Sequence, residues 1–466
     1  MEPIHSSFAI FSNEEAEMIR AASLRVLEKV GVRVVDPSLR DTLIKHGARR
    51  AGDCVQFPEQ LIWDAVAHAP RQVRLFGRDG SSLSSGDGVH RHGTAPSALA
   101  ILENDLERRP SRYEDVAGLT RLADHLEGID FLSAPAIAQD CPQEQTGLRT
   151  AEAVFCNTMK FCLAFALDRN EAETWIGMAE AVGALGESPV VGFAISPTSP
   201  LVLGKPTSDI LMMAAQRELP IVTVPGGMAG ATAPYTIAGA LVLEHAEALA
   251  VVTIAQLERP GVPCVLGLAS AVMDMPSGNI SLGSPERTLL LNAAAPLAHM
   301  WGLPGYAPVG LSDSWDLDMQ AGAEKTLSFV TNLASGLEFS SGVGRLEGGL
   351  LVSYEGLMID HELLQMVRRY WRGMRVTRET LAEEVIARIG PGKDYLTDPH
   401  TIRFLHGEEY GRFGLANRRG KAQGGWRMKE EAHRAVQRIL GGQPSRVPSD
   451  QQAEIKAFVG RLVSKQ

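Results

Sequence analysis

The chain has 466 residues, of which 45% are hydrophobic and 21% charged, so it is long enough to bury a large core and lacks the composition of a disordered protein. A formal net charge of −10 and a pI of about 5.7 exclude a strongly basic surface, and we expect no nucleic-acid partner. Five scattered cysteines without a CxxC pair or secretory signal indicate a cytoplasmic location, and no membrane segment is predicted because the apolar stretches are broken before the ~20 residues that a spanning helix needs.

Residues 1–85 are predicted to form an amino-terminal helical cap. Apolar residues at helical spacing predict one helix over 14–29 and the start of another over 37–46. The segment VRLFGR, residues 73–78, is expected to be a short strand that closes the cap. Alternating residues over 90–101 predict a further strand.

From there to residue 375 short apolar runs alternate with longer segments of helical periodicity. Runs without polar alternation are typical of parallel strands buried on both faces. The runs span 131–137, 161–167, 190–196, 220–226, 263–269, 306–312 and 337–343, and the helical segments span 170–185, 207–217, 234–257, 285–301, 318–335 and 354–374. With the strand near residue 95 the count is about eight, which predicts an α/β fold of the (β/α)8 TIM-barrel type over 86–375. An open doubly wound sheet is the alternative.

Residues 376–466 are predicted to form a charged carboxy-terminal helical extension. A helical pattern over 377–390 ends in Gly390-Pro391-Gly392. The segments 429–440 and 450–463 are amphipathic, so we expect them to pack on the barrel or on a second subunit. We therefore expect a homo-oligomer.

The active site of such a barrel lies at the carboxyl ends of its strands, where polar residues follow nearly every apolar run. Gly226 and Gly227 belong to PGGMAGATAP, residues 225–234, which precedes a helix. Its backbone amides can bind an anionic group or let a large cofactor approach, although a tight structural loop whose glycines satisfy strained turns is the favoured explanation from the loop alone. The other polar residues after the runs include Gln139, Asp140, Asp168, Ser196, Thr198, Ser199, Asp274, Ser312 and Arg345.

An Asp-rich segment, LSDSWDLDMQAGAEK (311–325), follows another predicted strand. A quaternary ammonium has no N–H to donate, so a protein holds it by carboxylates and aromatic faces. Asp313, Trp315 and Asp316 offer both kinds of group. The alternative is a helix amino-terminal cap beside a packed tryptophan.

Two histidines, His90 and His92, are expected to share one face of their strand, with Glu103 and Asp105 beyond the next turn. A metal site there is conceivable, but no third ligand stands at a recognisable spacing. Structural or cofactor-contacting histidines are favoured, and no metal is predicted.

Six blocks in order along the chain resemble the trimethylamine methyltransferase family, from about residue 20 to the carboxyl terminus. They are FGRDG (76–80), ERRPSRYEDVAGLTRLADHLEGIDFLS (107–133), GATAPYTIAGALVLEHAEALA (230–250), MDMPSGNISLGSPE (273–286), DMQAGAEK (318–325) and SYEGLMIDHELL (353–364). The resemblance implies a (β/α)8 barrel that moves a methyl group from a methylated amine to a Co(I) corrinoid (cobalamin) carried by a separate corrinoid-binding protein. Founding members carry pyrrolysine, and Ala323 stands at its expected place here. The resemblance therefore narrows to the non-pyrrolysine branch, represented by glycine betaine methyltransferase, and implies a quaternary amine as substrate.

On this resemblance we assign roles to ten residues. Asp313, Gln320 and Glu347 are expected to act in catalysis, Trp315, Asp316 and Tyr354 to bind substrate, and Gly226, Gly227, Thr232 and His361 to contact the cofactor. His361 stands where the family pattern has asparagine, which leaves room for a divergent subgroup. Such a subgroup would use tetrahydrofolate directly as methyl acceptor, and a non-catalytic betaine-binding barrel is a further alternative.

Overall fold

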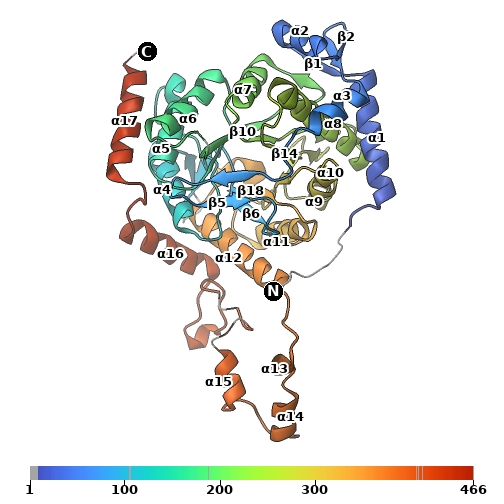
Figure 1. The fold of residues 1–466 in the computed structure, drawn as a ribbon. Helices are drawn as coiled ribbons and strands as arrows, with labels where there is room; N and C mark the ends of the chain where they lie inside the picture. The colour runs from blue at the N-terminus through green and yellow to red at the C-terminus, as the bar shows by residue number, and fades with distance from the viewer. Residues whose placement is uncertain are drawn as a thin grey trace.

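Seven parallel strands form the central sheet of the protein in a computed structural model, which describes residues 9–103, 107–186, 188–405, 407, 409–411 and 413–464 (Figure 1). In spatial order they are β6 (Arg91–Thr94), β18 (Phe339–Val343), β17 (Gly305–Pro308), β14 (Cys264–Gly267), β12 (Ile221–Thr223), β10 (Val191–Ile195) and β9 (Cys162–Ala164). Isolated parallel bridges join Phe131 to Gly93 and Leu132 to Cys162, so residues 131–132 lie between the two edge strands. The chain therefore has an α/β fold in which parallel strands curve around a common interior.

Six of the seven predicted apolar runs contain a strand of this sheet, and the strand near residue 95 is β6. The run 131–137 differs, because it forms only isolated bridges, at Phe131, Leu132 and Ala136. Pro135 interrupts it and has no N–H to donate to a ladder. The predicted eighth strand is thus a bridging segment. The predicted strand over 90–101 is likewise divided, into β6 and β7 (Ala100–Leu102), with Ser97 at a φ of 65° between them.

Large apolar side chains fill the space inside the curved sheet. Phe131, Phe161, Tyr306 and Phe339 meet there with smaller residues of β9, β10, β12 and β14. Val73 and Leu75, from the hairpin of β4 (Arg74–Phe76) and β5 (Ser82–Ser84), join the same cluster. Arg78 beside this hairpin donates from its backbone to Met159 O, just before β9, so the hairpin covers the amino-terminal ends of the strands and leaves the carboxyl ends for a site.

Helices pack around the outside of the sheet (Figure 1). The helices are α4 (Tyr113–His125), α5 (Thr146–Phe155), α6 (Arg169–Ala181), α7 (Lys205–Gln216), α8 (Ile237–Glu258), α9 (Pro285–Asn292), α10 (Ala294–His299), α11 (Met319–Ala334) and α12 (Tyr354–Trp371). Among the described helices α8 alone is long and apolar enough to span a membrane by length and composition, although Glu244 and Glu247 interrupt its apolar sequence. Its Glu244 and Glu247 are buried, and 78% of its apolar window lies inside the fold, as in a core helix.

The amino-terminal helices rest on this framework. α1 (Asn13–Lys29) begins with a capping box of Ser12 and Glu15 and packs on α8. β1 (Val32–Val34) pairs in parallel with β11 (Val202–Leu203), which ties the cap to the loop after β10. The other cap elements are α2 (Pro37–Lys45), β2 (Arg49–Ala51), β3 (Cys54–Gln56) and α3 (Glu59–Val66).

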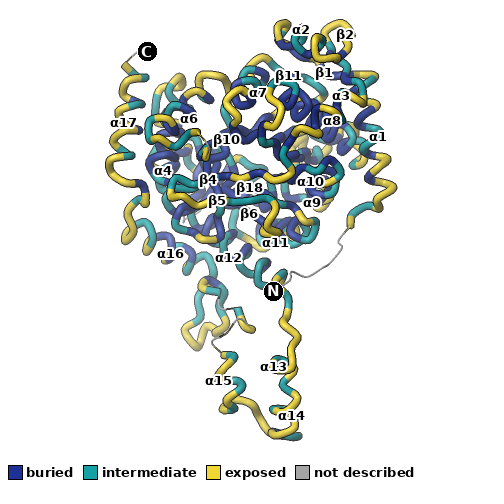
Figure 2. Tube along the Cα trace, viewed as in Figure 1, coloured by how far each residue is buried: buried dark blue, intermediate teal, exposed yellow. Residues whose placement is uncertain are grey.

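The carboxy-terminal extension has one part that packs on the main body and one part that projects from it. α16 (Met428–Gly442) packs on α12 and α4, and α17 (Ser449–Val463) packs on α5 and α6, so both predicted amphipathic segments lie on the main body. Residues 372–427, which we call the arm, project away from that body and are largely exposed (Figures 1 and 2). The arm carries α13 (Arg378–Leu381), α14 (Glu383–Ile389) and α15 (Pro399–Leu405); the helix predicted over 377–390 is broken at Ala382, whose φ is 53°.

Candidate functional site

An open cavity of about 600 Å³ lies at the carboxyl ends of β14, β17 and β18. Its volume is within the range of small-molecule sites. Most of its lining comes from the loop after β14, with one residue after β17 and a short stretch after β18. The lining residues are Val272, Met273, Asp274, Ser277, Asn279, Ile280, Ser281, Ser284, Glu286, Asp313, Glu347, Gly348 and Leu350.

The cavity lining is acidic. It contains four carboxylates, Asp274, Glu286, Asp313 and Glu347, and among the described residues that line it there is no Lys, Arg or His. Four carboxylates around an open space produce a negative potential that attracts cations and repels anions. The charge of the cavity therefore selects for a positively charged ligand.

Two hydrogen bonds fix the Asp313 carboxylate at the cavity wall. Ser281 Oγ donates to its Oδ2 at 2.6 Å, and the backbone N–H of Leu282 donates to its Oδ1 at 2.7 Å. Both donors lie at the end of the loop after β14, so this contact joins that loop to the loop after β17. The carboxylate is held in one orientation before any ligand arrives.

Behind Asp313, Glu324 of α11 holds the same loop. Its Oε2 accepts from Ser312 Oγ at 2.6 Å and from Asp313 N at 2.9 Å, and its Oε1 accepts from Gln320 Nε2 at 2.9 Å. A Cβ on Gly283 would collide with Glu324 Oε2, so only glycine permits this approach. Gln320 itself is exposed and does not line the cavity.

Glu347 stands at the tip of a hairpin formed by β19 (Arg345–Leu346) and β20 (Leu351–Val352). Arg108 Nη1 donates to its Oε1 at 2.7 Å, and its Oε2 is buried without a hydrogen-bond partner in the described part of the chain. Its backbone has a φ of 49° and donates to Ser314 O at 2.8 Å. This backbone contact brings the hairpin tip against the Asp313 loop.

The glycine-rich loop runs beside the cavity. β13 (Met228–Ala229) pairs in parallel with β15 (Ala271–Met273), which contributes Val272 and Met273 to the lining. Gly227 is buried, and a Cβ there would lie 3.2 Å from Ala233 Cβ, whereas Gly226 is exposed and a Cβ there would have no neighbouring atom within 4 Å. Thr232 Oγ1 accepts from Met228 N at 2.8 Å and closes the turn.

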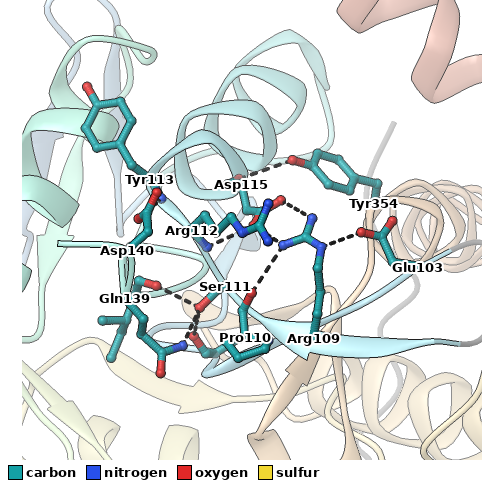
Figure 3. A network of polar contacts seen from close by, with 12 residues as sticks. Glu103, Arg109, Pro110, Ser111, Arg112, Tyr113, Asp115, Gln139, Asp140 and Tyr354 are labelled. Atoms are coloured by element: carbon teal, nitrogen blue, oxygen red, sulfur yellow. Dashed lines mark hydrogen bonds and ion pairs between the residues drawn. The ribbon is translucent and has the colours of Figure 1, made fainter.

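A second polar network lies away from the cavity, around Arg109 (Figure 3). Arg109 donates to both oxygens of Asp115, at 2.6 and 2.7 Å, and to Glu103 Oε1 at 2.5 Å. Tyr354 Oη donates to Asp115 O at 3.4 Å, and burial raises the pKa of this phenol above its usual range. Gln139 and Asp140 hold the same segment by bonds to Ser111 Oγ and Tyr113 N (Figure 3). Tyr354 thus belongs to a network that fixes α4, and not to the cavity lining.

Nearly the whole chain matches one protein family. The family model described as "Trimethylamine methyltransferase (MTTB)" matches residues 2–465. The chain belongs to the trimethylamine methyltransferase family. It is 31% identical over 404 residues to a trimethylamine methyltransferase MttB of Desulfitobacterium hafniense, a match that covers 85% of this chain and 81% of that protein.

Two further relatives bear on the fold and the branch of the family. A glycine betaine methyltransferase of Desulfitobacterium hafniense strain Y51 is 28% identical over 469 residues, 97% of each chain. The crystal structure of a hydroxylamine complex of MtmB matches with a TM-score of 0.51 and 12% identity, over 97% of this chain and 92% of that one, and so supports the fold alone. The resemblance drawn from the six sequence blocks is confirmed, and the protein is a methyltransferase of this family.

The remaining predicted residues of this family member lie at different distances from the cavity. Trp315 is 62% exposed, two residues beyond Asp313, and is not in the cavity lining. Asp316 Oδ1 accepts from Leu317 N at 2.6 Å and lies 3.8 Å from Lys429 Nζ. Ala323 is exposed on α11. Of the predicted catalytic and substrate residues, the structure brings Asp313 and Glu347 together in one wall.

His361 lies on the opposite side of the molecule from this wall. His361 is part of α12, and its ring packs against Gly128, which precedes Phe131 at the amino-terminal ends of the strands. The Nε2 atoms of His361 and Gln365 are 3.3 Å apart. Burial, with the nearby charges of Arg368 and Lys160, lowers the pKa of His361 to about 4. The side chain is therefore neutral at pH 7.

His90, which directly precedes β6, and His92 of β6 are buried and adjacent, as their alternation predicts. Ser340 Oγ lies 3.1 Å from His90 Nε2 and 2.6 Å from His92 Nδ1, and the two rings are 4.3 Å apart. Burial lowers the pKa of His90 to about 3 and that of His92 well below its usual value. Glu103 pairs with Arg109, and Asp105 lies outside the described residues. No group of three metal-binding side chains occurs among the residues that the structure describes.

Sequence reasoning missed several polar residues around the cavity. Glu286, Ser281 and Glu324 were not assigned a role, although all three lie in the blocks 273–286 and 318–325 that carry the family resemblance. A buried pair behind the wall was missed as well: Glu244 Oε1 accepts from Ser270 N at 2.6 Å, and burial raises the pKa of Glu244 to about 8. One signal could have indicated these residues: the segment after β14 is too long and too polar to be a simple turn.

Proposed function

We propose that this methyltransferase takes a methyl group from a quaternary ammonium compound, glycine betaine or a related betaine, and passes it to a Co(I) corrinoid carried by a separate protein. The observation that carries the proposal is the cavity with four carboxylates and no cationic residue in its described lining. A quaternary ammonium cannot donate a hydrogen bond, so a ring of carboxylates is the kind of polar site that suits it. Similarity to a glycine betaine methyltransferase over 97% of the chain supports the same substrate class.

The carboxylates of the cavity act mainly in binding. A quaternary ammonium already carries the charge that makes its nitrogen a neutral leaving group, so no general acid is required. Positive charge on the nitrogen falls as the methyl group departs, and fixed carboxylates consequently stabilise the bound substrate at least as much as the transition state. Their contribution is to strip water from the cation and hold one N–CH3 bond in line with the acceptor.

Individual roles follow from the contacts. Asp313, oriented by Ser281 and Leu282, contacts the ammonium group, and Glu347 faces it from the hairpin. Gln320 acts through Glu324, which holds the Asp313 loop. The exposed ring of Trp315 supplies an aromatic face once substrate or partner covers it. Asp316 and Tyr354 keep their proposed roles in substrate binding, although neither lines the cavity.

The protein offers a surface on which a large cofactor presented by a partner can rest. Gly226 is exposed with open space around it, and the loop beyond it pairs with the strand that lines the cavity. We assign Gly226, Gly227, Thr232 and His361 to this contact. For His361 the assignment requires that the partner also reach the middle of α12, beside Gly128. When bound, the corrinoid supplies the nucleophile that accepts the methyl group. The residues of this chain position the substrate and exclude water.

We also infer that residues 131–132 serve as the eighth strand and close a (β/α)8 barrel over residues 86–375. In this division of the chain, residues 1–85 form the cap and residues 376–466 form the extension.

The extension supports a further proposal, that the protein is a homo-oligomer joined through the arm. Nine of the 24 large hydrophobic side chains that are exposed in the described chain lie on the arm. A cytoplasmic location agrees with these proposals.

The proposed function is tested by incubating the purified protein with a panel of quaternary and tertiary amines and Co(I) cobalamin, and following methylation of the cobalamin by absorbance. We expect turnover with one betaine and none with trimethylamine. Methylation of tetrahydrofolate with cobalamin absent would replace the corrinoid by folate as acceptor. Betaine binding without turnover with either acceptor would favour a binding protein.

A further inference from the structure

A buried arginine lies at the base of the hairpin whose tip lines the cavity, and among the described residues its charge has no partner. Arg345 is on β19, directly after β18, and it pairs across the hairpin with Val352 of β20. The tip of this hairpin supplies three residues of the cavity lining, Glu347, Gly348 and Leu350. The adjacent Leu346 points into the apolar cluster with Leu102 and Leu351, so Arg345 points to the other face of the hairpin.

The Arg345 side chain is only 5% exposed. Its Nε and Nη1 are buried without a hydrogen-bond partner, and no ion pair to it is found in the part of the chain that the structure describes. Burial alone lowers the pKa of Arg345 to about 9, with no carboxylate near enough to raise it. The guanidinium is still charged at pH 7.

The other two buried cations of the described chain differ from Arg345. Lys325 Nζ is 2.6 Å from Asp360 Oδ2. Arg287 donates to Leu282 O at 3.0 Å and to Pro308 O at 2.9 Å, and the charge of Asp313 opposes the lowering of its pKa by burial. Arg345 has neither kind of compensation. A buried charge without a partner is costly, and an anion that enters the site would remove that cost.

We propose that Arg345 binds the carboxylate of a zwitterionic substrate whose ammonium group occupies the acidic cavity. This inference rests on the proposed function and deepens it, since it names the residue that recognises the carboxylate of a betaine and excludes choline and tetramethylammonium as good substrates. Arg345 lies at the base of the hairpin and Glu347 at its tip. Two consecutive Cα–Cα steps keep their Cα atoms within about 7.6 Å of each other, so the pair suits a small molecule that carries opposite charges a few bonds apart. The arginine fork suits a carboxylate because it can donate two parallel hydrogen bonds.

The test measures binding by calorimetry, without any methyl acceptor, of glycine betaine and of choline, which shares the trimethylammonium group and lacks the carboxylate. We expect wild-type protein to bind glycine betaine more tightly. Arg345→Met should weaken glycine betaine binding by about 10- to 100-fold, the usual effect of losing a hydrogen bond to a charged group, and should change choline binding less than about twofold. Arg169→Met, an exposed arginine after β9 at the same end of the sheet, is the matched control and should change neither.

Thermal unfolding of the ligand-free proteins separates a ligand-binding role from a structural one. Replacing an uncompensated buried charge by a methionine of similar length should raise the Tm of Arg345→Met above that of wild type. A lower Tm, or an equal loss of choline and glycine betaine binding, would show that Arg345 supports the fold, and would overturn the proposal. If wild-type protein bound neither quaternary amine, the proposed function would fail, and Arg345-dependent binding of dimethylglycine or acetate would still decide whether the anion site exists.

Discussion

At the scale of single residues, Asp313 is the side chain on which substrate recognition should depend most. It is held at the cavity wall by Ser281 Oγ and Leu282 N, so Asp313→Asn removes the charge and leaves the shape of the wall nearly unchanged. Because the carboxylate acts on the bound cation, we expect the KM for the amine to rise about 10-fold or more while kcat falls less than about threefold. Steady-state kinetics with varied substrate measure both.

Asp318→Asn is the control for this change. Asp318 accepts from Ala321 N at 2.9 Å as the cap of α11, lies outside the cavity lining, and can be replaced by asparagine without loss of the cap. Asp318→Asn therefore removes one negative charge from the same segment as Asp313→Asn does. Equal effects of both variants would mean that only the net charge of the region matters, and would contradict the assignment of Asp313.

Glu244 predicts a pH dependence of stability. Burial raises its pKa from 4.5 to about 8, although Ser270 N and Ala269 N donate to it. Below pH 4.5 the folded and unfolded states both hold the proton; between about 4.5 and 8 only the folded state holds it, so raising the pH favours unfolding. Wild type should therefore lose stability relative to Glu244→Gln as the pH rises from about 5 toward 8.

Urea unfolding midpoints at several pH values in that window measure the difference. Glu127→Gln, an exposed glutamate after α4, is the control and should run parallel to wild type. If the Glu244→Gln curve also ran parallel to wild type across the window, Glu244 would titrate in the folded protein as it does in the unfolded chain, and the raised pKa would be wrong.

At the scale of the elements, the buried pair of Lys325 and Asp360 joins α11 to α12. Asp360 Oδ2 also accepts from Gly344 N at 2.6 Å, so the pair fixes the turn from which the Arg345 hairpin starts. Lys325→Met leaves a buried carboxylate without its cation and should lower the free energy of unfolding by about 3–5 kcal/mol. Lys325→Met combined with Asp360→Asn should recover part of the loss, because the amide keeps the acceptor for Gly344.

Chemical denaturation of the two variants and of Lys205→Met checks this expectation. Lys205 is exposed and pairs with Asp36, at 3.1 Å, and with Asp209, and its loss should lower the free energy of unfolding far less than Lys325→Met does. A double variant less stable than Lys325→Met would show that Asp360 contributes more through other contacts than through the lysine.

The elements themselves were largely predictable from the sequence. The strand positions within runs such as 190–196 and 263–269 carry no polar alternation because both faces of β10 and β14 are buried, and that pattern differs from helical spacing. The run 131–137 has the same composition, yet Pro135 limits it to bridges, which periodicity does not register. The position of Asp313 after β17 was predictable for the same reason as the strand. The partners Ser281 and Glu324 were not, since the loop after β14 folds back in a way that no local pattern encodes.

At the scale of the whole molecule, the arm cannot be stable through its own interior. Over residues 372–427 the structure describes only two buried hydrophobic side chains, Ile389 and Leu415, against nine exposed ones. A segment of this size with so small a core does not offset the entropy of ordering its backbone, so we propose that another surface covers it. The exposed residues run along its length (Figure 2).

Charge favours a second copy of the chain as the surface that we propose covers the arm. The arm has 11 Lys and Arg against 7 Asp and Glu, a formal charge of +4, while the whole chain carries −10, which leaves −14 on the remainder. A basic, apolar arm fits the acidic body of an identical subunit, and two copies related by a two-fold axis can exchange arms so that both are covered. The arm contacts would then be buried in the oligomer and exposed in the monomer.

Leu396→Glu tests this arrangement, because Leu396 is 80% exposed on the arm and a buried glutamate without a partner would disfavour association. We expect wild-type protein to elute as an oligomer in size-exclusion chromatography with light scattering, and Leu396→Glu to shift toward monomer by about tenfold or more in dissociation constant. Leu167→Glu, 81% exposed on the main body, introduces the same change away from the arm and should remain oligomeric. A wild-type monomer at micromolar concentration would contradict the interface and would leave the arm as a surface for the corrinoid-carrying partner, whose addition should then protect Leu396 and its neighbours from hydrogen exchange.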